Sequence, residues 1–143
     1  MDNGPKYPNT KLGKYPHFFP GDAPIWERFI DNFGDSFSGF DYDVKVGSGT
    51  EPVEGLGDSY RKMQHDLSTY RIDAIGYTPD AIYIFEIKPD ASLHAIGQAL
   101  NYARLYTRDF NPSKRIIAAI VTDRKMPDME YLTKEHDILY YVV

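Results

Sequence analysis

Two short runs rich in Ile, Tyr and Phe, separated by a turn sequence, constrain the fold of this chain most strongly. The runs are residues 70–77 and 81–88, and Thr78-Pro79-Asp80 lies between them. Aromatic and β-branched residues favour strands, whereas Pro and Asp favour tight turns. The pattern therefore predicts an antiparallel β-hairpin.

The turn also sets the register of the predicted hairpin. If Pro79 and Asp80 are the central turn residues, Asp73 lies opposite Glu86 and the strands end near Lys88. Opposed side chains in an antiparallel pair have Cβ atoms about 4.5–5.5 Å apart, so like charges at such positions are destabilising. Two acids that face each other therefore require a compensating cation.

Apolar side chains are expected on both faces of this hairpin, which predicts a central position in the sheet. Burial in such a sheet raises the pKa of a carboxyl group unless a metal or a base compensates its charge. Strand alternation assigns the apolar residues to the two faces. The face of the acids carries Ile75, Ile82 and Ile84, and the other face carries Ile72, Ala74, Phe85 and Ile87.

The charged residues of the hairpin suggest metal chemistry. Hard divalent cations such as Mg²⁺ and Mn²⁺ prefer oxygen ligands, and two carboxylates with water and a substrate phosphate suit them. Lys88 follows Glu86 by two residues, so its ammonium is expected on the face of the acids. There it can orient or deprotonate an attacking water, or neutralise charge that develops on a phosphate.

These charged residues resemble the signature of a known family. Asp73, followed thirteen positions later by Glu86-Ile87-Lys88 on the next strand, resembles the motif of the PD-(D/E)XK nuclease superfamily. The similar region covers roughly residues 24–123. Arg71-Ile72 stands where the name-giving proline would precede the aspartate, a departure that leaves the charge geometry intact.

The resemblance implies an α/β fold, with a restriction-endonuclease-like αβββαβ core in which helices flank a central mixed sheet. It implies that Asp73 and Glu86 bind Mg²⁺ or Mn²⁺ with help from the Ile87 carbonyl. Lys88 would then serve the nucleophilic water, and the substrate would be DNA.

A predicted helix adds to the resemblance. Ser92 is a candidate N-cap for a helix that runs to about residue 109, and its apolar residues indicate burial on two faces. Gln98 and Tyr102 lie one turn apart on one side of it. They are similar to the Gln-x-x-x-Tyr motif of RecB-type and lambda-exonuclease-type members, which implies that they line the site or contact the DNA backbone.

The remaining elements follow from local patterns. Residues 24–33 predict a helix with Asp22 as its N-cap, and residues 40–46 alternate as a first strand. The apolar run within residues 114–123 predicts an internal strand parallel to residues 81–88. Residues 127–135 indicate a short helix or a loop, and residues 138–143 a final strand.

Residues 1–23 predict an extended arm in front of a single domain over residues 24–143. Four prolines and three glycines exclude a helix or a central strand there. The arm carries aromatic residues, so it either folds over its own domain or docks onto another subunit or protein. His17, between Pro16 and two Phe residues, is interpreted as a packing residue.

Residues 47–68 form a long connection that contains four glycines. Long loops are often functional or mobile. The connection lacks the lysine of a Walker motif, so no nucleotide cofactor is expected. Residues 60–65 suggest one helical turn with the basic pair Arg61-Lys62, which is either a flap that contacts phosphate or a solvated loop.

Length and charge restrict the function further. The 143 residues carry a net charge of −5, which argues against a protein that wraps duplex DNA with a general basic surface. The chain has no cysteine, no signal segment and no apolar run long enough to cross a membrane. A cytoplasmic protein, or one carried in a phage particle, is therefore expected.

Three hypotheses follow. The first is a metal-dependent nuclease that hydrolyses DNA phosphodiester bonds. The second is a catalytically silent, nuclease-like structural or adaptor protein, for example a phage virion component that docks through its N-terminal arm. The third is a nuclease subunit that needs a helicase or guide partner. The intact set of Asp73, Glu86 and Lys88 favours the first over the second.

Overall fold

A five-stranded mixed sheet in the order β1-β2-β3-β4-β5 organises the protein. The structure is a computed structural model that describes residues 4–50, 55 and 57–143. Strands β1, β2 and β3 are antiparallel, whereas β4 and β5 are parallel to β3. The elements are α1 (Asp22–Phe33), a 3₁₀ turn (Gly34–Ser36), β1 (Gly39–Val46), α2 (Asp58–Ser68), β2 (Tyr70–Tyr77), β3 (Ala81–Ile87), α3 (Leu93–Phe110), β4 (Arg115–Thr122), α4 (Met129–Glu135) and β5 (Leu139–Val142).

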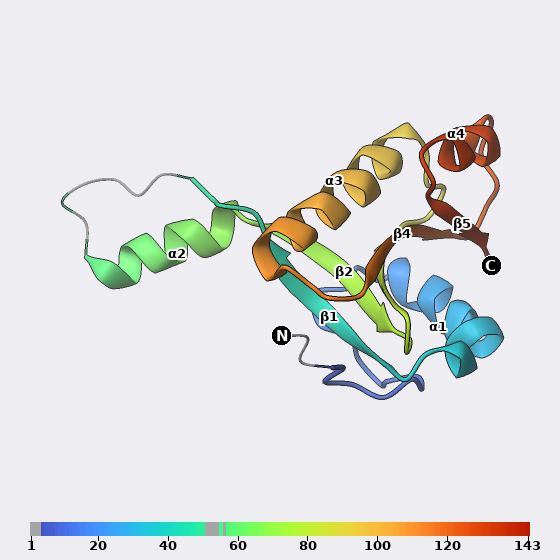
Figure 1. Cartoon of the computed structure of the whole chain (residues 1–143), viewed down its shortest axis with the longest axis horizontal. Helices are drawn as coiled ribbons and strands as arrows, with labels where there is room; N and C mark the ends of the chain where they lie inside the picture. Colours follow the sequence, from blue (N-terminus) through green and yellow to red (C-terminus); the bar gives the residue numbers. More distant parts are fainter. Residues whose placement is uncertain (1–3, 51–54, 56) are drawn as a thin grey trace.

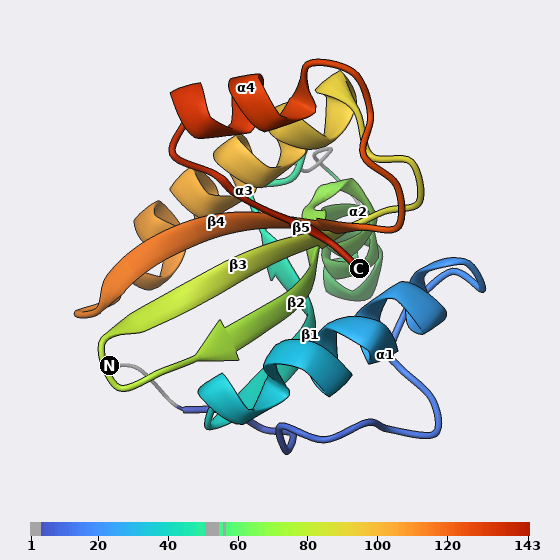
Figure 2. The same cartoon turned by 90° about the vertical axis from the view of Figure 1, so that its right-hand side faces the viewer.

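Helices cover the sheet on two sides. Helices α3 and α4 lie on one face, while α1 and the N-terminal segment lie on the other (Figure 2). Helix α2 projects away from these layers at the side of the sheet (Figure 1). Apart from α2, the element order is the αβββαβ arrangement that the sequence predicts, and the predicted mixed sheet with flanking helices is confirmed.

The predicted hairpin and its register are confirmed. Ala74 pairs with Phe85, and the pairing continues to Tyr77 and Ile82. Thr78 closes the turn, because its amide donates to the carbonyl of Ala81 at 3.0 Å. The observed pairs run from Ala74–Phe85 to Tyr77–Ile82, and the predicted Asp73–Glu86 pair lies just beyond them and is not among the observed partners.

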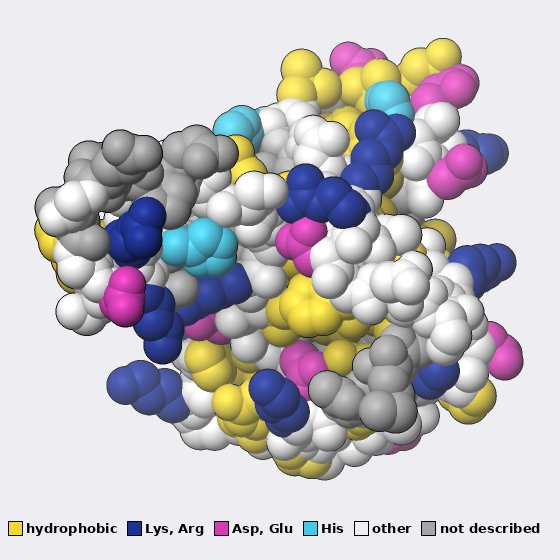
Figure 3. Space-filling view, turned by 60° about the vertical axis from the view of Figure 1, so that its left-hand side comes forward, with side chains coloured by type: hydrophobic (Ala, Val, Ile, Leu, Met, Phe, Trp, Pro, Cys, Tyr) yellow, Lys and Arg dark blue, Asp and Glu magenta, His cyan; other side chains and the backbone are white. Residues whose placement is uncertain are grey.

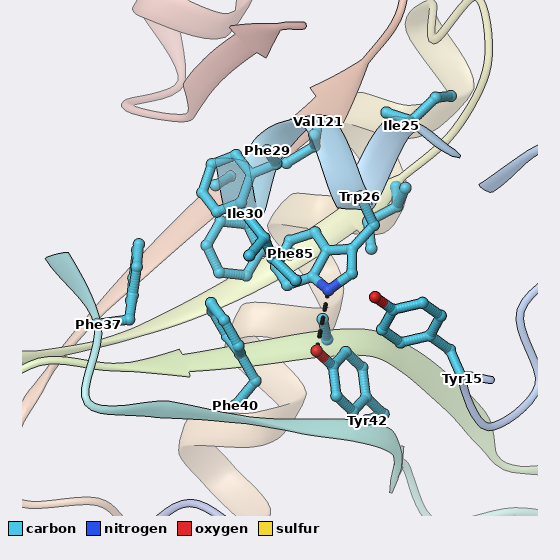
Figure 4. Packing of buried hydrophobic residues seen from close by; sticks show 13 residues of the cluster. Tyr15, Ile25, Trp26, Phe29, Ile30, Phe37, Phe40, Tyr42, Phe85 and Val121 are labelled. Carbon is cyan, nitrogen blue, oxygen red and sulfur yellow. Dashed lines mark hydrogen bonds between the residues drawn. The ribbon is translucent and has the colours of Figure 1, made fainter. Parts of the chain in front are cut away.

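An aromatic cluster fills the space between α1 and the sheet. Trp26 and Phe29 of α1 are fully buried against Phe40 of β1 and Phe85 of β3 (Figure 4). The Trp26 ring lies 5.1 Å from that of Phe85, in an edge-to-face arrangement that aromatic pairs favour. The Trp26 indole N–H donates to the Tyr42 hydroxyl at 2.9 Å, so the buried polar atoms of this pair are satisfied.

The alternation of β1 and β2 changes at one level of the sheet. Ile72 packs with Ile75 on the α3 side, so the prediction that these residues face opposite ways is wrong. Tyr42 pairs with Ala74 and Val44 with Ile72, and between these pairs lie Asp43 and Asp73. Asp43 has a positive φ of 55°, a conformation that breaks the regular pleat.

Helix α3 buries one face and leaves another open. Its buried residues recur with helical spacing along the side that faces the sheet and α4: Ala95, Ile96, Ala99, Ala103 and Tyr106. The prediction that α3 is buried on two faces is therefore wrong. Leu93, which it places in an apolar stripe, is 66% exposed.

The N-terminal segment packs along its own domain. Tyr7 forms an isolated antiparallel bridge with Phe40, with two backbone hydrogen bonds of 3.0 Å. The Tyr15 side chain is buried within the aromatic cluster. Its hydroxyl accepts the amide hydrogen of Leu12 at 3.0 Å. Phe19, in contrast, is 75% exposed.

Local predictions around α1 and α2 need correction. Asp22 is the first residue of α1 rather than its N-cap, which is Gly21. Its carboxylate accepts the amide hydrogen of Phe19 at 3.2 Å, so it satisfies a backbone group before the helix. The predicted single turn over residues 60–65 is an eleven-residue helix, α2. Part of the predicted 47–68 connection, residues 51–54 and 56, lies outside the described residues.

In the described part of the chain, no helix combines the length and the apolar character that crossing a bilayer requires.

Candidate functional site

A pocket of about 710 Å³ lies at the end of the central strands. It gathers side chains from β2, the end of β3 and α3, together with residues from the N-terminal segment and the start of α1. All the residues that the sequence singled out line this pocket: Asp73, Glu86, Ile87, Lys88, Gln98 and Tyr102. The fold thus brings residues far apart in the sequence to one place, and we refer to it as the acid pocket.

Asp73 is held by the backbone of the neighbouring strand. Its Oδ2 accepts the amide hydrogen of Ile87 at 2.9 Å. Burial is the largest influence on its carboxyl group and raises the pKa. The Ile87 amide opposes this rise, while the nearby charges of Asp22 and Asp43 add to it. The pKa of Asp73 is raised overall, because one hydrogen bond does not offset desolvation and two acidic neighbours.

Glu86 is buried more deeply than most glutamates, with 8% of its surface exposed. Burial raises its pKa strongly, and the charge of Asp73 raises it further. Because each acid disfavours ionisation of the other, the pair titrates as a unit. Without a cation, the folded protein therefore holds protons on this pair at pH values where free carboxyl groups are ionised.

Lys88 supplies a positive charge beside the acids. Its ammonium lowers the pKa of Asp73 and of Glu86, although burial outweighs this effect at both. The Lys88 side chain is exposed at the pocket mouth, so solvent weakens its influence. Asp22, also buried, is a further acid in the pocket. One lysine thus faces three acids, and their charges are not balanced locally.

Gln98 and Tyr102 come from one side of α3. The Gln98 Nε2 donates to the Tyr102 hydroxyl at 3.4 Å, a long hydrogen bond. Burial raises the pKa of Tyr102, so its hydroxyl stays protonated at neutral pH. Among the described residues, the buried Gln98 Oε1 has no hydrogen-bond partner. An unpaired buried amide oxygen has an energetic cost, so this part of the pocket is not optimised for stability alone.

Sequence reasoning missed three residues of the pocket. Arg71 Nη1 contacts both carboxylate oxygens of Asp43, at 2.7 and 2.8 Å. His17 Nε2 lies 3.2 Å from Asp43 Oδ2 and its side chain is 63% exposed, so its interpretation as a packing residue is wrong. His17 and Asp43 both have positive φ, which no sequence pattern here indicates. Only the opposite charges of Asp43 and Arg71 on adjacent strands could have suggested a pair.

The donor set of the acid pocket fits a hard divalent cation. Asp73 and Glu86 provide carboxylate oxygens from neighbouring strands, and the raised pKa of each shows that their negative charge lacks compensation. Mg²⁺ is commonly held by one or two carboxylates, with water and phosphate completing its ligands. Within the described residues, no group of three or more Asp, Glu, His or Cys side chains is placed to hold a metal ion, so a metal here would rely on the two carboxylates with water and phosphate.

The chain has little similarity to known proteins. No protein-family model matches the chain, and no curated protein matches it. A solved structure described as the crystal structure of a repair endonuclease from Pyrococcus abyssi is similar, with 9% sequence identity and a TM-score of 0.46. The similarity covers 92% of this chain and 49% of that one, so this chain spans about half the length of that endonuclease.

Proposed function

We propose that the protein is a metal-dependent nuclease that hydrolyses phosphodiester bonds of DNA. In this proposal Asp73 and Glu86 hold Mg²⁺ or Mn²⁺, with help from the Ile87 carbonyl. When bound, the metal polarises the phosphate and lowers the pKa of a water ligand. The family resemblance of these residues and the αβββαβ core support the assignment to nucleases.

One observation carries the proposal: two buried carboxyl groups from neighbouring strands line one pocket, and the charge of Asp73 raises the cost of ionising Glu86. Such a pair is costly in a protein whose only task is structural, because like charges without compensation destabilise the folded state. A divalent cation removes this cost, and it places positive charge where a phosphate can bind.

The side chains around the acids have roles that follow from their positions. The Ile87 amide fixes the orientation of the Asp73 carboxylate through its 2.9 Å hydrogen bond. Lys88, near both acids and exposed at the pocket mouth, can orient the attacking water and neutralise charge on the phosphate. Gln98 and Tyr102 present amide and hydroxyl groups to the DNA backbone.

A cleavage assay tests the proposal. Purified protein is incubated with linear and with circular DNA in the presence of Mg²⁺ or Mn²⁺, and the products are separated on gels. Wild type is expected to cut at least one substrate. Asp73→Asn removes a metal ligand and Lys88→Ala removes the group that serves the water, so each should lower the rate by roughly 10²-fold or more.

The controls separate chemistry from folding. Lys134→Ala changes an exposed lysine on α4, far in sequence from the acid pocket and not among its lining residues, and should leave cleavage unchanged. Circular dichroism checks that every variant is folded. Absence of cleavage with both metals, or cleavage as fast as that of wild type by both Asp73→Asn and Lys88→Ala, would rule out the nuclease proposal.

The alternative of a silent structural or adaptor protein that docks through its N-terminal arm remains a proposal with less support. Tyr7 and Tyr15 of the arm contact the protein's own core, so these aromatic side chains are already used. Phe19 is exposed, but it lines the acid pocket. These contacts favour a role for the arm beside the acid pocket over a role in assembly with another protein.

A further inference from the structure

A second groove, of about 880 Å³, runs over the outer side of α3. The buried residues of α3 point to the sheet and to α4, so this side is left without a covering layer. We call it the α3 groove. Its lining includes Tyr70, Leu93, His94, Gly97, Asn101 and Arg104.

The α3 groove is continuous with the acid pocket. Tyr70, Gln98 and Tyr102 line both of them. The rings of Tyr70 and Tyr102 lie 5.5 Å apart at this junction, and Tyr70 is 53% exposed. A chain-like ligand with one phosphate in the acid pocket can therefore extend into the α3 groove without leaving the protein surface.

Gly97 leaves an open place on the surface of α3. It is exposed, has no positive φ, and a Cβ at this position would meet no atom within 4 Å. Neither backbone conformation nor internal packing therefore requires a glycine here. Because glycine has no side chain, a ligand in the α3 groove can lie directly against the helix backbone at this point.

The side chains of the α3 groove suit nucleotides. Exposed aromatic rings such as Tyr70 and the imidazole of His94 offer flat faces on which bases stack. Arg104, exposed on the same helix, can pair with a phosphate.

The surrounding surface supports a local contact with a polyanion. Figure 3 shows Lys, Arg and His side chains, with Asp and Glu side chains among them, on the side of the molecule that carries α2. Arg61 and Lys62 are exposed on α2, whose end leads directly into Tyr70. The α2 sequence also contains Asp58 and Asp66, and the whole chain has a net charge of −5, so Arg61 and Lys62 can provide individual phosphate contacts but not a general DNA-binding surface.

We propose that the α3 groove binds a single-stranded segment of the nucleic acid whose scissile phosphate occupies the acid pocket. This inference rests on the proposed nuclease function and names the form of its substrate. A single strand is favoured over a duplex because a base can stack on Tyr70 only when it is released from its own paired stack. The preferred substrate then has an unpaired end or an unpaired branch.

Binding, measured without cleavage, tests the α3 groove. Fluorescence anisotropy with the full chain and EDTA compares a labelled 20-nucleotide thymidine strand with a blunt 20-base-pair duplex. Wild type is expected to bind the single strand at least tenfold more tightly. Tyr70→Ala removes a stacking face and should weaken this binding roughly 5- to 100-fold. Arg104→Ala should weaken it and lower the salt dependence by about 0.7 in the log–log slope.

Gly97→Leu provides a test that a folding defect cannot imitate. Leucine has the higher helix propensity, so the variant should unfold at a higher temperature than wild type. Its side chain fills the open space above the helix, so single-strand binding should fall at least tenfold. Arg28→Ala on α1 and Tyr131→Ala on α4 change exposed residues of matched type outside the α3 groove, and both should bind as wild type does.

The outcomes separate the two proposals. Equal affinity for single strand and duplex, or unchanged binding by Gly97→Leu and Tyr70→Ala, would overturn the proposal that the α3 groove binds a single strand, even if the protein cuts DNA. Single-strand binding that these variants weaken supports the α3 groove, even if no metal gives cleavage and the nuclease function fails. If wild type binds neither the thymidine strand nor the duplex, the proposal for the α3 groove is overturned, and a protein ligand is favoured for this surface.

Discussion

Neighbouring residues of the β2–β3 hairpin belong to two contrasting regions. Phe85 lies in the aromatic cluster, where its ring contacts Trp26 and Phe29 at centroid distances of 5.1 and 5.0 Å. Glu86, the next residue, points to the other face and meets Asp73 in the acid pocket. Both side chains are buried. Phe85 is surrounded by apolar rings, whereas Glu86 lies beside a second acid.

This contrast separates stability from chemistry within one strand. The aromatic cluster is neutral, and its Trp26–Tyr42 hydrogen bond satisfies the polar atoms that it buries. The acid pocket contains charges that the chain alone does not compensate. The aromatic cluster should therefore hold the fold together under all conditions, whereas the acid pocket should weaken it unless a cation is present.

The largest expected effect comes from truncation in the aromatic cluster. Phe85→Ala removes a ring that is 1% exposed and leaves a cavity among the rings of Trp26 and Phe29. It should lower the free energy of unfolding by about 3–5 kcal/mol, as measured by urea denaturation. Phe110→Ala, at a ring that is 47% exposed, is the matched control and should cost much less. Similar losses for both would show that the cluster does not dominate stability.

The second prediction concerns the metal. At pH 8 and without DNA, Mg²⁺ or Mn²⁺ at about 100 times its dissociation constant should stabilise wild type by about 2.7 kcal/mol. The same addition should leave Asp73→Asn almost unchanged, because the variant lacks one carboxylate of the pair. Thermal unfolding with increasing metal concentration measures both. A rise in melting temperature that is equal in the two proteins would locate the bound metal elsewhere.

The sequence predicted the scaffold of the site well, because strong local signals specify it. Thr78-Pro79-Asp80 fixed the turn, and with it the register that pairs Ala74 with Phe85 and Tyr77 with Ile82. The apolar run of β4 indicated a buried parallel strand, as observed. Both signals depend on a few neighbouring residues, so they can be interpreted without knowledge of the rest of the chain.

The periphery of the site could not be predicted in the same way. His17 and Asp43 meet through backbone conformations with positive φ, which His and Asp adopt more readily than most residues but which no local pattern at these two positions indicates. The change of strand alternation at Asp43 and Asp73 moved Ile72 to the α3 side, against the regular period of two. The groove around Gly97 depends on what does not pack there, and no sequence pattern reports this.

The third prediction is a substitution at Glu86 that raises the free energy of unfolding, whereas Phe85→Ala lowers it. Because burial and Asp73 raise the pKa of Glu86, the folded protein binds its proton at higher pH than the unfolded chain does. Stability of the metal-free protein therefore falls as pH rises from the ordinary carboxyl range near 4 through the raised pKa. Glu86→Gln removes this loss and should gain on the order of 1–2 kcal/mol at pH 8.

Urea denaturation of wild type and Glu86→Gln at pH 4.5 and pH 8, both in EDTA, checks the third prediction. The two proteins should be similar at pH 4.5, where wild type keeps both acids protonated, and should diverge at pH 8. A matched change at an exposed acid, Glu135→Gln at the end of α4, should show no such divergence. Destabilisation of Glu86→Gln at both pH values would mean that the acid pair is a structural element like its apolar neighbours.

The smallest expected effect comes from removing a buried polar group that already has a hydrogen-bond partner. Tyr42→Phe removes the hydroxyl that accepts the Trp26 indole hydrogen at 2.9 Å, and it leaves a buried donor without a partner. It should cost about 1–2 kcal/mol at both pH values, because no titration near neutral pH is involved. DNA cleavage should be unchanged, since Tyr42 does not line the acid pocket. Loss of a buried oxygen would then weaken the protein at Tyr42, whereas loss of a buried charge strengthens it at Glu86. A cleavage defect in Tyr42→Phe would instead couple the aromatic cluster to the site through β1.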